Sequence, residues 1–222
     1  MAPAGMRRVD SFEISIPPLG LPGTLRIPDD AFALIVFAHG SGSSRLSPRN
    51  VMVAEALNRA GLATLLFDLL HPAEDPEHNR AKVFDIPLLA ERLVAAVRWI
   101  DQTTNLSTKP LGLFGASTGA AAALVAATEL GERVGAVVSR GGRPDLAGDA
   151  LELVKAATLL IVGGADYGVI ELNQAALARL KCVKAIKIVR GATHLFPEPG
   201  AMEQVIALAA SWFEQHLRVS PI

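Results

Sequence analysis

The stretch "LGLFGASTGAAAALVAA", residues 111–127, passes from an apolar run to an alanine-rich run through a single serine, Ser117. The run "LGLF" has the pattern of a buried strand, and the residues from Ser117 onward have the pattern of a helix. Glycine stands two residues before the serine and two residues after it, so the stretch reads G-x-S-x-G. This pattern predicts a strand, a sharp turn that carries Ser117, and a helix.

The same alternation continues on both sides of this stretch. Nearly continuous apolar runs predict buried strands at 32–39 and 62–70. Further strands are predicted at 134–139, 158–164 and 184–189. Apolar residues at helical spacing predict helices at 51–61, 86–100, 117–130, 169–180 and 201–217, with a short helix at 149–154. The alternation indicates an α/β fold, with a mostly parallel central sheet and helices on both faces.

The N-terminal part differs from this pattern. Residues 11–16 and 24–28 alternate between apolar and polar positions around the turn signal "PPLGLPG", which predicts an antiparallel hairpin. The chain contains no fixed-period repeat and no linker-like tract, so we expect one domain over 1–222.

Composition narrows the class of protein. Half of the 222 residues are hydrophobic, and 21 Lys and Arg face 22 Asp and Glu, so no strongly basic surface for nucleic acid is expected. No apolar stretch reaches the roughly 18 residues that span a bilayer, and no apolar segment follows the arginines of "MAPAGMRRVDSF". The single cysteine, Cys182, excludes an internal disulfide and is compatible with a reducing compartment. We therefore expect a cytoplasmic protein without a membrane partner; its oligomeric state is left open.

Ser117 has two interpretations on the residues alone. Serine is favoured as the residue that caps a helix N-terminus. A serine on a strained strand-to-helix turn can instead be a nucleophile, because the turn lifts its hydroxyl above the sheet edge beside the positive end of a helix. The glycines at 115 and 119 would then be needed because side chains there would clash.

Two later residues favour the second interpretation. Asp166 directly follows the predicted strand 158–164, and His194 follows the predicted strand 184–189. The chain order serine, acid, histidine predicts a triad in which His194 accepts the Ser117 proton and Asp166 orients the imidazole. The alternatives are a helix cap for Asp166 and an ordinary loop residue for His194.

An oxyanion hole requires two backbone N–H groups near the serine. Thr118, next after the serine, should supply one, and Ser41 in the loop "HGSGSS" should supply the other, with glycines at 40 and 42 allowing close approach. His39 at the end of a buried strand is interpreted as structural, with its imidazole hydrogen-bonded to loop backbone.

Substrate contacts are expected from the other loops at this edge. Arg140 and Arg143 in "RGGRPDL" could bind a substrate carboxylate, or could pair with Asp145 or another acid. Tyr167 and Phe196 could line an apolar pocket, or could belong to the core. No metal-ligand spacing is visible, so no metal and no organic cofactor is expected; "HPAEDPEHNR" reads as a solvated loop.

The segments "VFAHGSGSS", "GASTG", "VGGADYGV" and "GATHLF" resemble those of the α/β-hydrolase superfamily. The size of the chain and the absence of a large cap domain are similar to the dienelactone-hydrolase-like branch. "SRGGRPDL" and "GASTGAAAAL" further resemble hydrolase domains that are sometimes fused to phosphoribosyltransferase domains, although this chain has no phosphoribosyltransferase signature. The resemblance implies an eight-stranded type of sheet and hydrolysis of an ester or lactone through Ser117, Asp166 and His194.

One residue departs from the resemblance. Dienelactone hydrolases carry cysteine as nucleophile, whereas this chain has serine there, and Cys182 is expected to be buried before a strand. The resemblance thus implies a small carboxylic ester or lactone as substrate, with dienelactone itself in doubt. An acyltransferase with the same triad, or a non-catalytic interaction module on the same fold, are the alternatives.

Overall fold

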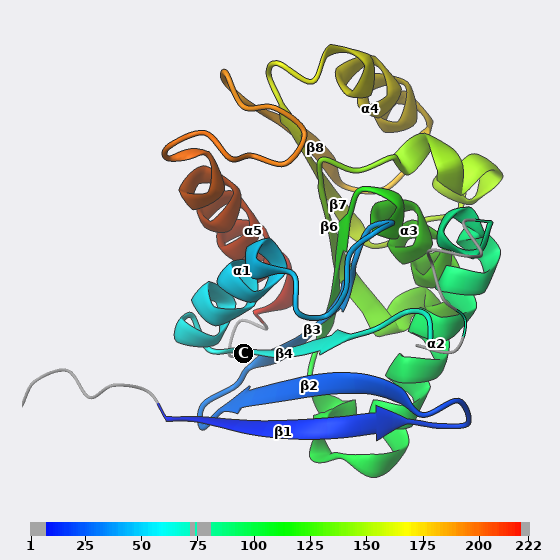
Figure 1. The fold of residues 1–222 in the computed structure, drawn as a ribbon, viewed down its shortest axis with the longest axis vertical. Helices are drawn as coiled ribbons and strands as arrows, with labels where there is room; N and C mark the ends of the chain where they lie inside the picture. The colour runs from blue at the N-terminus through cyan, green and yellow to red at the C-terminus, as the bar shows by residue number, and fades with distance from the viewer. Residues whose placement is uncertain (1–7, 72–73, 75–80, 219–222) are drawn as a thin grey trace, which may run out of the picture.

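A computed structural model describes residues 8–71, 74 and 81–218. It contains an eight-stranded sheet in the order β1-β2-β4-β3-β5-β6-β7-β8 (Figure 1). The strands are β1 (Val9–Ile16), β2 (Leu21–Pro28), β3 (Ala33–Ala38), β4 (Leu62–Phe67), β5 (Leu111–Ala116), β6 (Val134–Arg140), β7 (Ala157–Gly163) and β8 (Lys184–Val189). The strands from β3 onward pair in parallel, while β1 pairs with β2 and β2 with β4 antiparallel. The predicted parallel sheet and the predicted N-terminal hairpin are both confirmed.

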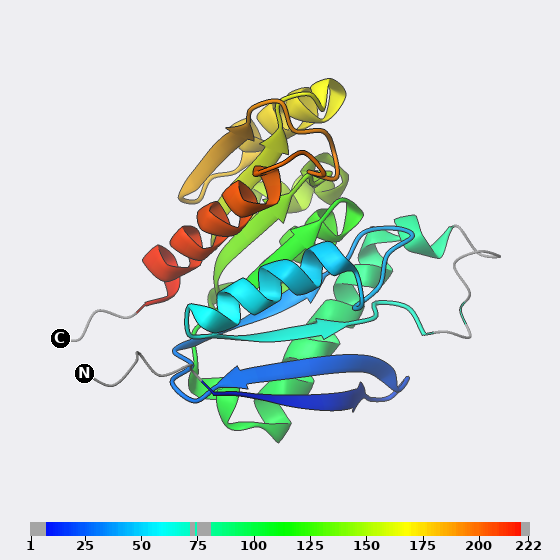
Figure 2. The ribbon, with the colours of Figure 1, turned by 60° about the vertical axis from the view of Figure 1, so that its left-hand side comes forward.

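Helices cover both faces of this sheet (Figures 1 and 2). Helices α1 (Pro48–Arg59) and α5 (Ala201–Leu217) lie on one face, and α2 (Ile86–Thr103), α3 (Thr118–Leu130) and α4 (Tyr167–Arg179) lie on the other. Short 3₁₀ segments connect them: η2 (Lys82–Phe84), η3 (Asn105–Thr108), η4 (Gly131–Arg133) and η5 (Pro144–Glu152).

Each face of the sheet has its own apolar core, because alternate residues of a strand point to opposite faces. In β3, Leu34 and Val36 belong to the core under α2 and α3, whereas Ile35 and Phe37 belong to the core under α1 and α5. In each of the strands β3, β4 and β5, all six residues are buried, as expected for strands covered on both faces.

Several element boundaries differ from the sequence prediction by a few residues, and two of the differences have a clear structural cause. The strand predicted at 111–114 continues to Ala116, because Gly115 and Ala116 still pair with β6. The short helix predicted at 149–154 is part of the 3₁₀ segment Pro144–Glu152, which is interrupted at Gly148, where φ is 55°. A glycine in that conformation breaks a regular helix, which explains the difference.

The direction in which successive strands are added to the sheet reverses at β3, in the middle of the sheet. From β3 the chain passes through α1 to β4 on one side, and β5 then pairs with the other side of β3. Loops after β3 and β5 therefore lead away to opposite faces, and ligand sites of parallel α/β sheets form at such a point. The loop with Ser41 and the turn with Ser117 both begin there.

Two sequence predictions lie largely outside the described residues. These are the N-terminal segment "MAPAGMR" and most of the polar loop "HPAEDPEHNR". Among the described helices, none combines the length and the apolar character that a membrane span requires.

Glu74, which the structure does describe in that polar loop, makes a cluster of ionic contacts. Its carboxylate accepts hydrogen bonds from Lys82 Nζ at 2.8 Å, from the backbone N–H of His71 at 2.8 Å, and from both terminal nitrogens of Arg92 at 3.2 and 3.3 Å. Burial by itself would raise the pKa of Glu74, but these contacts outweigh it and lower the pKa from 4.5 to about 2. The cluster thus connects the segment after β4 to helix α2.

Replacement of Glu74 by glutamine should remove a pH-dependent part of the stability. The pKa of Glu74 is lower in the folded state than in the unfolded state, so the ionised carboxylate stabilises the folded protein. This stabilisation is fully present above the unfolded pKa and is lost as the pH falls from about 4.5 toward 2. We expect Glu74→Gln to lower the free energy of unfolding by about 1–2 kcal/mol near neutral pH, and by less at about pH 3. Urea denaturation at the two pH values measures this.

Glu129→Gln is the matched control, because the ion pair of Glu129 with Arg98 is largely exposed. Its loss should cost about 0–1 kcal/mol. A Glu74→Gln effect that is equal at both pH values would contradict the assignment.

Candidate active site

Ser117 occupies a strained turn between β5 and α3. Its φ is 51° and its ψ is −123°, in the positive-φ region that residues with a side chain rarely adopt. Such a conformation costs on the order of 1–3 kcal/mol and persists only where the surroundings enforce it. The Ser117 side chain makes no capping hydrogen bond to helix α3, so the interpretation as a helix cap does not hold.

The glycines around Ser117 are required by close packing, as the sequence predicted. A Cβ atom at Gly115 would overlap the backbone of Gly119 and Ala120, and a Cβ atom at Gly119 would overlap the backbone of Ala38 and His39. A Cβ atom at Gly40 would lie 2.8 Å from Ser117 Cβ. The turn can therefore form only where these three positions lack side chains.

Asp166 and His194 meet at the ends of β7 and β8. His194 Nδ1 lies 2.7 Å from Asp166 Oδ2, and the side chains are 36% and 16% exposed. Asp166 stands at the N-terminus of α4 but makes no side-chain capping bond, so its carboxylate serves the histidine instead. An ionised carboxylate only accepts hydrogen bonds, so Nδ1 of His194 is the donor of this contact, and in a neutral imidazole Nε2 is then the nitrogen that can accept a proton.

Neighbouring backbone contacts hold these two loops together. The N–H of Ala165 donates to the carbonyl oxygen of Ala192 at 2.9 Å, and a Cβ atom at Gly163 would overlap that same carbonyl. Beyond His194, the side chain of Phe196 is 1% exposed and packs into the core under α1 and α5. Phe196 thus anchors the loop that carries the histidine, and its φ of 56° shows that the anchored loop is tightly bent.

The segment Arg140–Gly141 lies between Ser117 and His194. The N–H of Ser117 donates to the carbonyl oxygen of Arg140 at 3.3 Å, and a Cβ atom at Gly141 would lie 2.8 Å from the carbonyl oxygen of His194. Among the described residues, the Ser117 hydroxyl has no hydrogen-bond partner, His194 included. In hydrolytic enzymes without substrate such contacts are often long and tighten when substrate binds.

The two predicted oxyanion-hole residues are neighbours in space. The N–H of Ser41 donates to the hydroxyl of Thr118 at 3.0 Å, so the loop after β3 contacts the first residue of α3. The N–H of Thr118 belongs to the first turn of a helix, where N–H groups have no partner inside the helix. A substrate oxygen near Ser41 would compete with the Thr118 hydroxyl for the same N–H.

His39 is structural, as the sequence indicated. Its Nε2 accepts the N–H of Leu69 at 3.0 Å, so Nδ1 carries the proton and donates to the carbonyl oxygen of Gly40 at 3.0 Å. Burial lowers the pKa of His39 below its ordinary value, which keeps the ring neutral. Both ring nitrogens are occupied by backbone.

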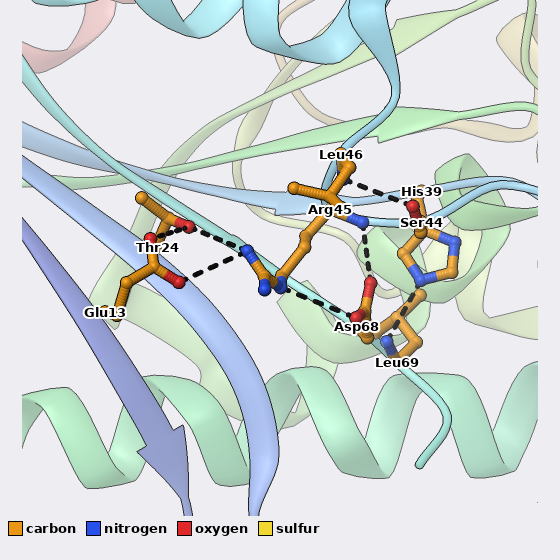
Figure 3. A network of polar contacts seen from close by, with 8 residues as sticks. All are labelled: Glu13, Thr24, His39, Ser44, Arg45, Leu46, Asp68 and Leu69. Carbon is orange, nitrogen blue, oxygen red and sulfur yellow. Dashed lines mark hydrogen bonds and ion pairs between the residues drawn. The ribbon is translucent and has the colours of Figure 1, made fainter. Parts of the chain in front are cut away.

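Arg45 and Asp68 hold the loop that carries Ser41 (Figure 3). The N–H of Arg45 donates to Asp68 Oδ1 at 2.6 Å, and Arg45 Nε lies 3.6 Å from Asp68 Oδ2. The guanidinium also donates to Thr24 Oγ1 at 3.1 Å and pairs with Glu13 at 3.3 Å. The loop is thereby connected to the end of β4 and to the N-terminal hairpin.

Sequence analysis did not identify Arg45 and Asp68. The available signal was the position of Asp68, which directly follows the strand β4 just as Asp166 follows the end of β7. Its arginine partner could not be found from sequence, because the two residues are 23 positions apart.

The four residues predicted to contact substrate have different surroundings. Arg143 donates two hydrogen bonds to Asp145, at 2.8 and 2.9 Å, and these raise the pKa of Arg143. Of the two interpretations of Arg143, substrate binding or an ion pair with Asp145, the structure shows the ion pair. Phe196 lies in the core, which was also its alternative, and Tyr167 is 75% exposed at the start of α4. Arg140 is buried without any acidic partner among the described residues.

Cavities open beside the loop after β3. One of about 180 Å³ is lined by residues 39–44 and by apolar side chains that include Leu69, Leu70, Val83 and Leu89. A larger one of about 870 Å³ shares residues 41–44 and extends past Arg49 to Val83 and Phe84. Gly40, which contacts Ser117, lies at the wall of the smaller cavity.

Replacement of Gly119 by alanine tests the turn. The new methyl group would overlap backbone that cannot move independently of β3, so we expect a loss of about 1–3 kcal/mol or more in the free energy of unfolding. Gly168→Ala in α4 is the matched control, because the space beside Gly168 is open; alanine there should be neutral or slightly stabilising. Equal effects of the two changes in urea denaturation would argue against a steric requirement at Gly119.

Comparison with known proteins agrees with the fold. Residues 33–185 match the family model described as "alpha/beta hydrolase fold". A crystal structure of a dienelactone hydrolase from Anabaena variabilis has a TM-score of 0.91 and 52% identity, and the match covers 96% of this chain and 99% of that one. Est1E from Butyrivibrio proteoclasticus has a TM-score of 0.77 at 16% identity, over 93% of this chain and 98% of that one, and shows likeness of fold alone.

The matching curated relatives are longer proteins. One from Mycobacterium tuberculosis (strain ATCC 25618 / H37Rv), named "Putative phosphoribosyl transferase Rv0571c", is 55% identical over 210 residues, which is 95% of this chain and 47% of that protein. This chain therefore spans about half the length of the curated relatives it matches. From the family model, the order of the sheet and the likeness to a dienelactone hydrolase over nearly its whole length, the chain belongs to the α/β-hydrolase fold family, in its dienelactone-hydrolase-like branch.

Proposed function

We propose that this protein is a serine hydrolase that cleaves a small carboxylic ester or lactone through an acyl-enzyme. The observation that carries the proposal is the pair Asp166–His194, at 2.7 Å, beside a serine held at positive φ on a strand-to-helix turn. A strained serine that does not cap its helix, together with a histidine oriented by a carboxylate, is the arrangement that nucleophilic catalysis requires.

In the first half of the reaction, Ser117 Oγ forms a bond to the carbonyl carbon while its proton passes to His194 Nε2. The carbonyl oxygen becomes an oxyanion, which the N–H groups of Thr118 and Ser41 stabilise. The imidazolium then gives its proton to the leaving alcohol as the carbon–oxygen bond breaks. Asp166 stabilises the transient positive charge and keeps the proton on Nδ1.

In the second half, water attacks the acyl-enzyme. His194 Nε2 takes a proton from the water, the oxyanion forms again in the same place, and Ser117 leaves with the proton from His194. The carboxylic acid is released and the serine is restored. The small cavity with Leu69, Leu70 and Leu89 would accept an apolar part of the substrate.

A fluorophosphonate probe tests the nucleophile. It should label the wild-type protein, and Ser117→Ala should abolish both labelling and hydrolysis of short aryl esters. Ser139→Ala is the matched control. Ser139 is also a buried serine near the end of a neighbouring strand, but its side chain and that of Arg140 point to opposite faces of the sheet. Wild-type protein that resists the probe would favour a non-catalytic module, and labelled protein that hydrolyses no ester or lactone would favour acyl transfer.

Replacement of Asp68 by alanine tests the placement of the oxyanion loop. The change removes the acceptor of the Arg45 N–H and its ionic partner, so the N–H of Ser41 should lose its fixed position. Loss of one oxyanion donor costs about 10²–10³ in kcat, so we expect a decrease of about tenfold to a hundredfold in kcat with a smaller change in KM.

Asp101→Ala controls for the loss of a partly buried ion pair. Asp101 pairs with Arg133 at the other end of the sheet, at 2.8 and 3.0 Å. Its removal should lower stability while kcat stays close to that of wild type. An equal loss of kcat in both variants would mean that Asp68 acts through stability alone.

A further inference from the structure

Asn173 occupies a position in helix α4 where an apolar side chain is expected. Most residues of this helix are partly or fully exposed, and its two buried residues are Asn173 and Ala176. Asn173 is the more completely buried of the two, at 0% exposure. A buried amide is unfavourable unless its hydrogen bonds are made, so a polar residue at this position requires an explanation.

The side-chain amide of Asn173 reaches out of its own helix. Nδ2 donates to the carbonyl oxygen of Gly142 at 3.0 Å and, within α4, to the carbonyl oxygen of Val169 at 2.8 Å. Both neighbours only accept hydrogen bonds, so the NH₂ group must face them. Oδ1 is buried without a hydrogen-bond partner among the described residues. The amide therefore serves as a donor, and its one bond beyond the helix goes to Gly142.

Gly142 lies in a segment that holds Ser117 from both sides. The carbonyl oxygen of Arg140 accepts the N–H of Ser117 at 3.3 Å, and the N–H of Arg143 donates to the carbonyl oxygen of Ser117 at 3.0 Å. A Cβ atom at Gly142 would lie 2.5 Å from the Cβ atom of Ala120, in the first turn of α3. The backbone on either side of Gly142 thus fixes the turn that carries the candidate nucleophile.

The helix that carries Asn173 also carries the acid of the proposed triad. Asp166 stands immediately before α4, and its carboxylate oxygen Oδ2 lies 2.7 Å from Nδ1 of His194. Asn173 follows Asp166 by seven residues, which is about two helical turns. Helix α4 is therefore bonded to the histidine loop at its N-terminus, and to the segment around Ser117 through Asn173. A shift of α4 relative to that segment would change the separation between base and nucleophile.

We propose that Asn173 is a positioning residue that fixes the pair Asp166–His194 relative to Ser117. Its amide connects α4 to the segment that holds the nucleophile turn, at a place where an apolar side chain would need no hydrogen bond. It acts through Gly142 and not through the reacting atoms. The inference rests on the proposed hydrolase function for its effect on catalysis, but the connection itself can be measured without turnover.

The first experiment replaces Asn173 by leucine, which has a similar size and cannot donate a hydrogen bond. Misplacement by about 1 Å within an active site can lower a rate about a hundredfold. We expect kcat for short aryl esters to fall about tenfold to a hundredfold, with a much smaller change in KM. The rate at which a fluorophosphonate probe labels Ser117 should fall to a similar degree. Asn173→Ala, with a residue that favours helices, is a second variant that should give the same result if leucine does not fit.

Asn58→Leu is the matched control. Asn58 is also a buried asparagine on a helix, and its Nδ2 donates to the carbonyl oxygen of Leu62 at 2.9 Å and to Thr64 Oγ1 at 3.0 Å. These partners lie at the start of β4, at the opposite edge of the sheet from Ser117. Each variant loses a buried hydrogen bond, so both should have a Tm lower by about 2–10 °C. We expect Asn173→Leu alone to lower kcat per folded molecule and the labelling rate.

The second experiment follows amide hydrogen exchange without any substrate. In Asn173→Leu, the N–H groups of Ser117 and Arg143 should exchange about tenfold faster than in the wild type, because the segment between them has lost its contact with α4. Asn58→Leu should leave both rates closer to those of the wild type. An increase that comes only from lower overall stability would appear in both variants.

The two proposals can fail separately. If the probe labels the wild type but Asn173→Leu keeps the kcat and the labelling rate of Asn58→Leu, the positioning role is overturned and the hydrolase proposal stands. Equal exchange rates at Ser117 and Arg143 in the two variants also overturn the positioning role. If the wild type resists the probe, the hydrolase proposal falls; faster exchange in Asn173→Leu alone would then still support the connection between α4 and the turn.

Discussion

The close approach of helix α3 to the ends of β3 and β5 is the constraint on which the rest of the site depends. It requires a backbone without side chains at positions 40, 115 and 119, and it forces Ser117 into a positive φ. The strain at Ser117 is small compared with the apolar burial of β3, β5 and the alanine face of α3, which together hold the turn in place. The serine is therefore presented by packing and by hydrogen bonds of its backbone, not by a capping bond of its side chain.

Around this turn, three loops are each fixed by specific contacts, two of them ionic. The loop with Ser41 is held by ions, through Arg45 and Asp68. The loop with His194 is held by burial, through Phe196, and by a backbone bond between Ala165 and Ala192. The segment after β4 is held by Glu74 on Lys82 and Arg92. These contacts fix the loops of the candidate site, and the proposed stabilisation of an oxyanion requires donors held in a fixed geometry.

The charges near the site are distributed unevenly. His39 is kept neutral by burial and by two backbone partners, and Arg143 is neutralised by Asp145. Arg140 and Arg49 each retain buried guanidinium nitrogens without a hydrogen-bond partner, and the neighbouring Ser139 hydroxyl is buried without a partner as well.

The sequence by itself determined the order of elements, the hairpin, and the position of Ser117, Asp166 and His194 at strand ends, because apolar periodicity and glycine spacing are local properties of the chain. It also determined that His39 is structural, since a histidine closing a buried strand meets backbone. The roles of Arg143 and Phe196 stayed open between two alternatives each, and the Arg45–Asp68 contact could not be inferred from the sequence. Only the tertiary structure decided these roles and this contact. Each depends on which group from a distant part of the chain, such as a carboxylate, a cation or a set of apolar core residues, lies next to the side chain.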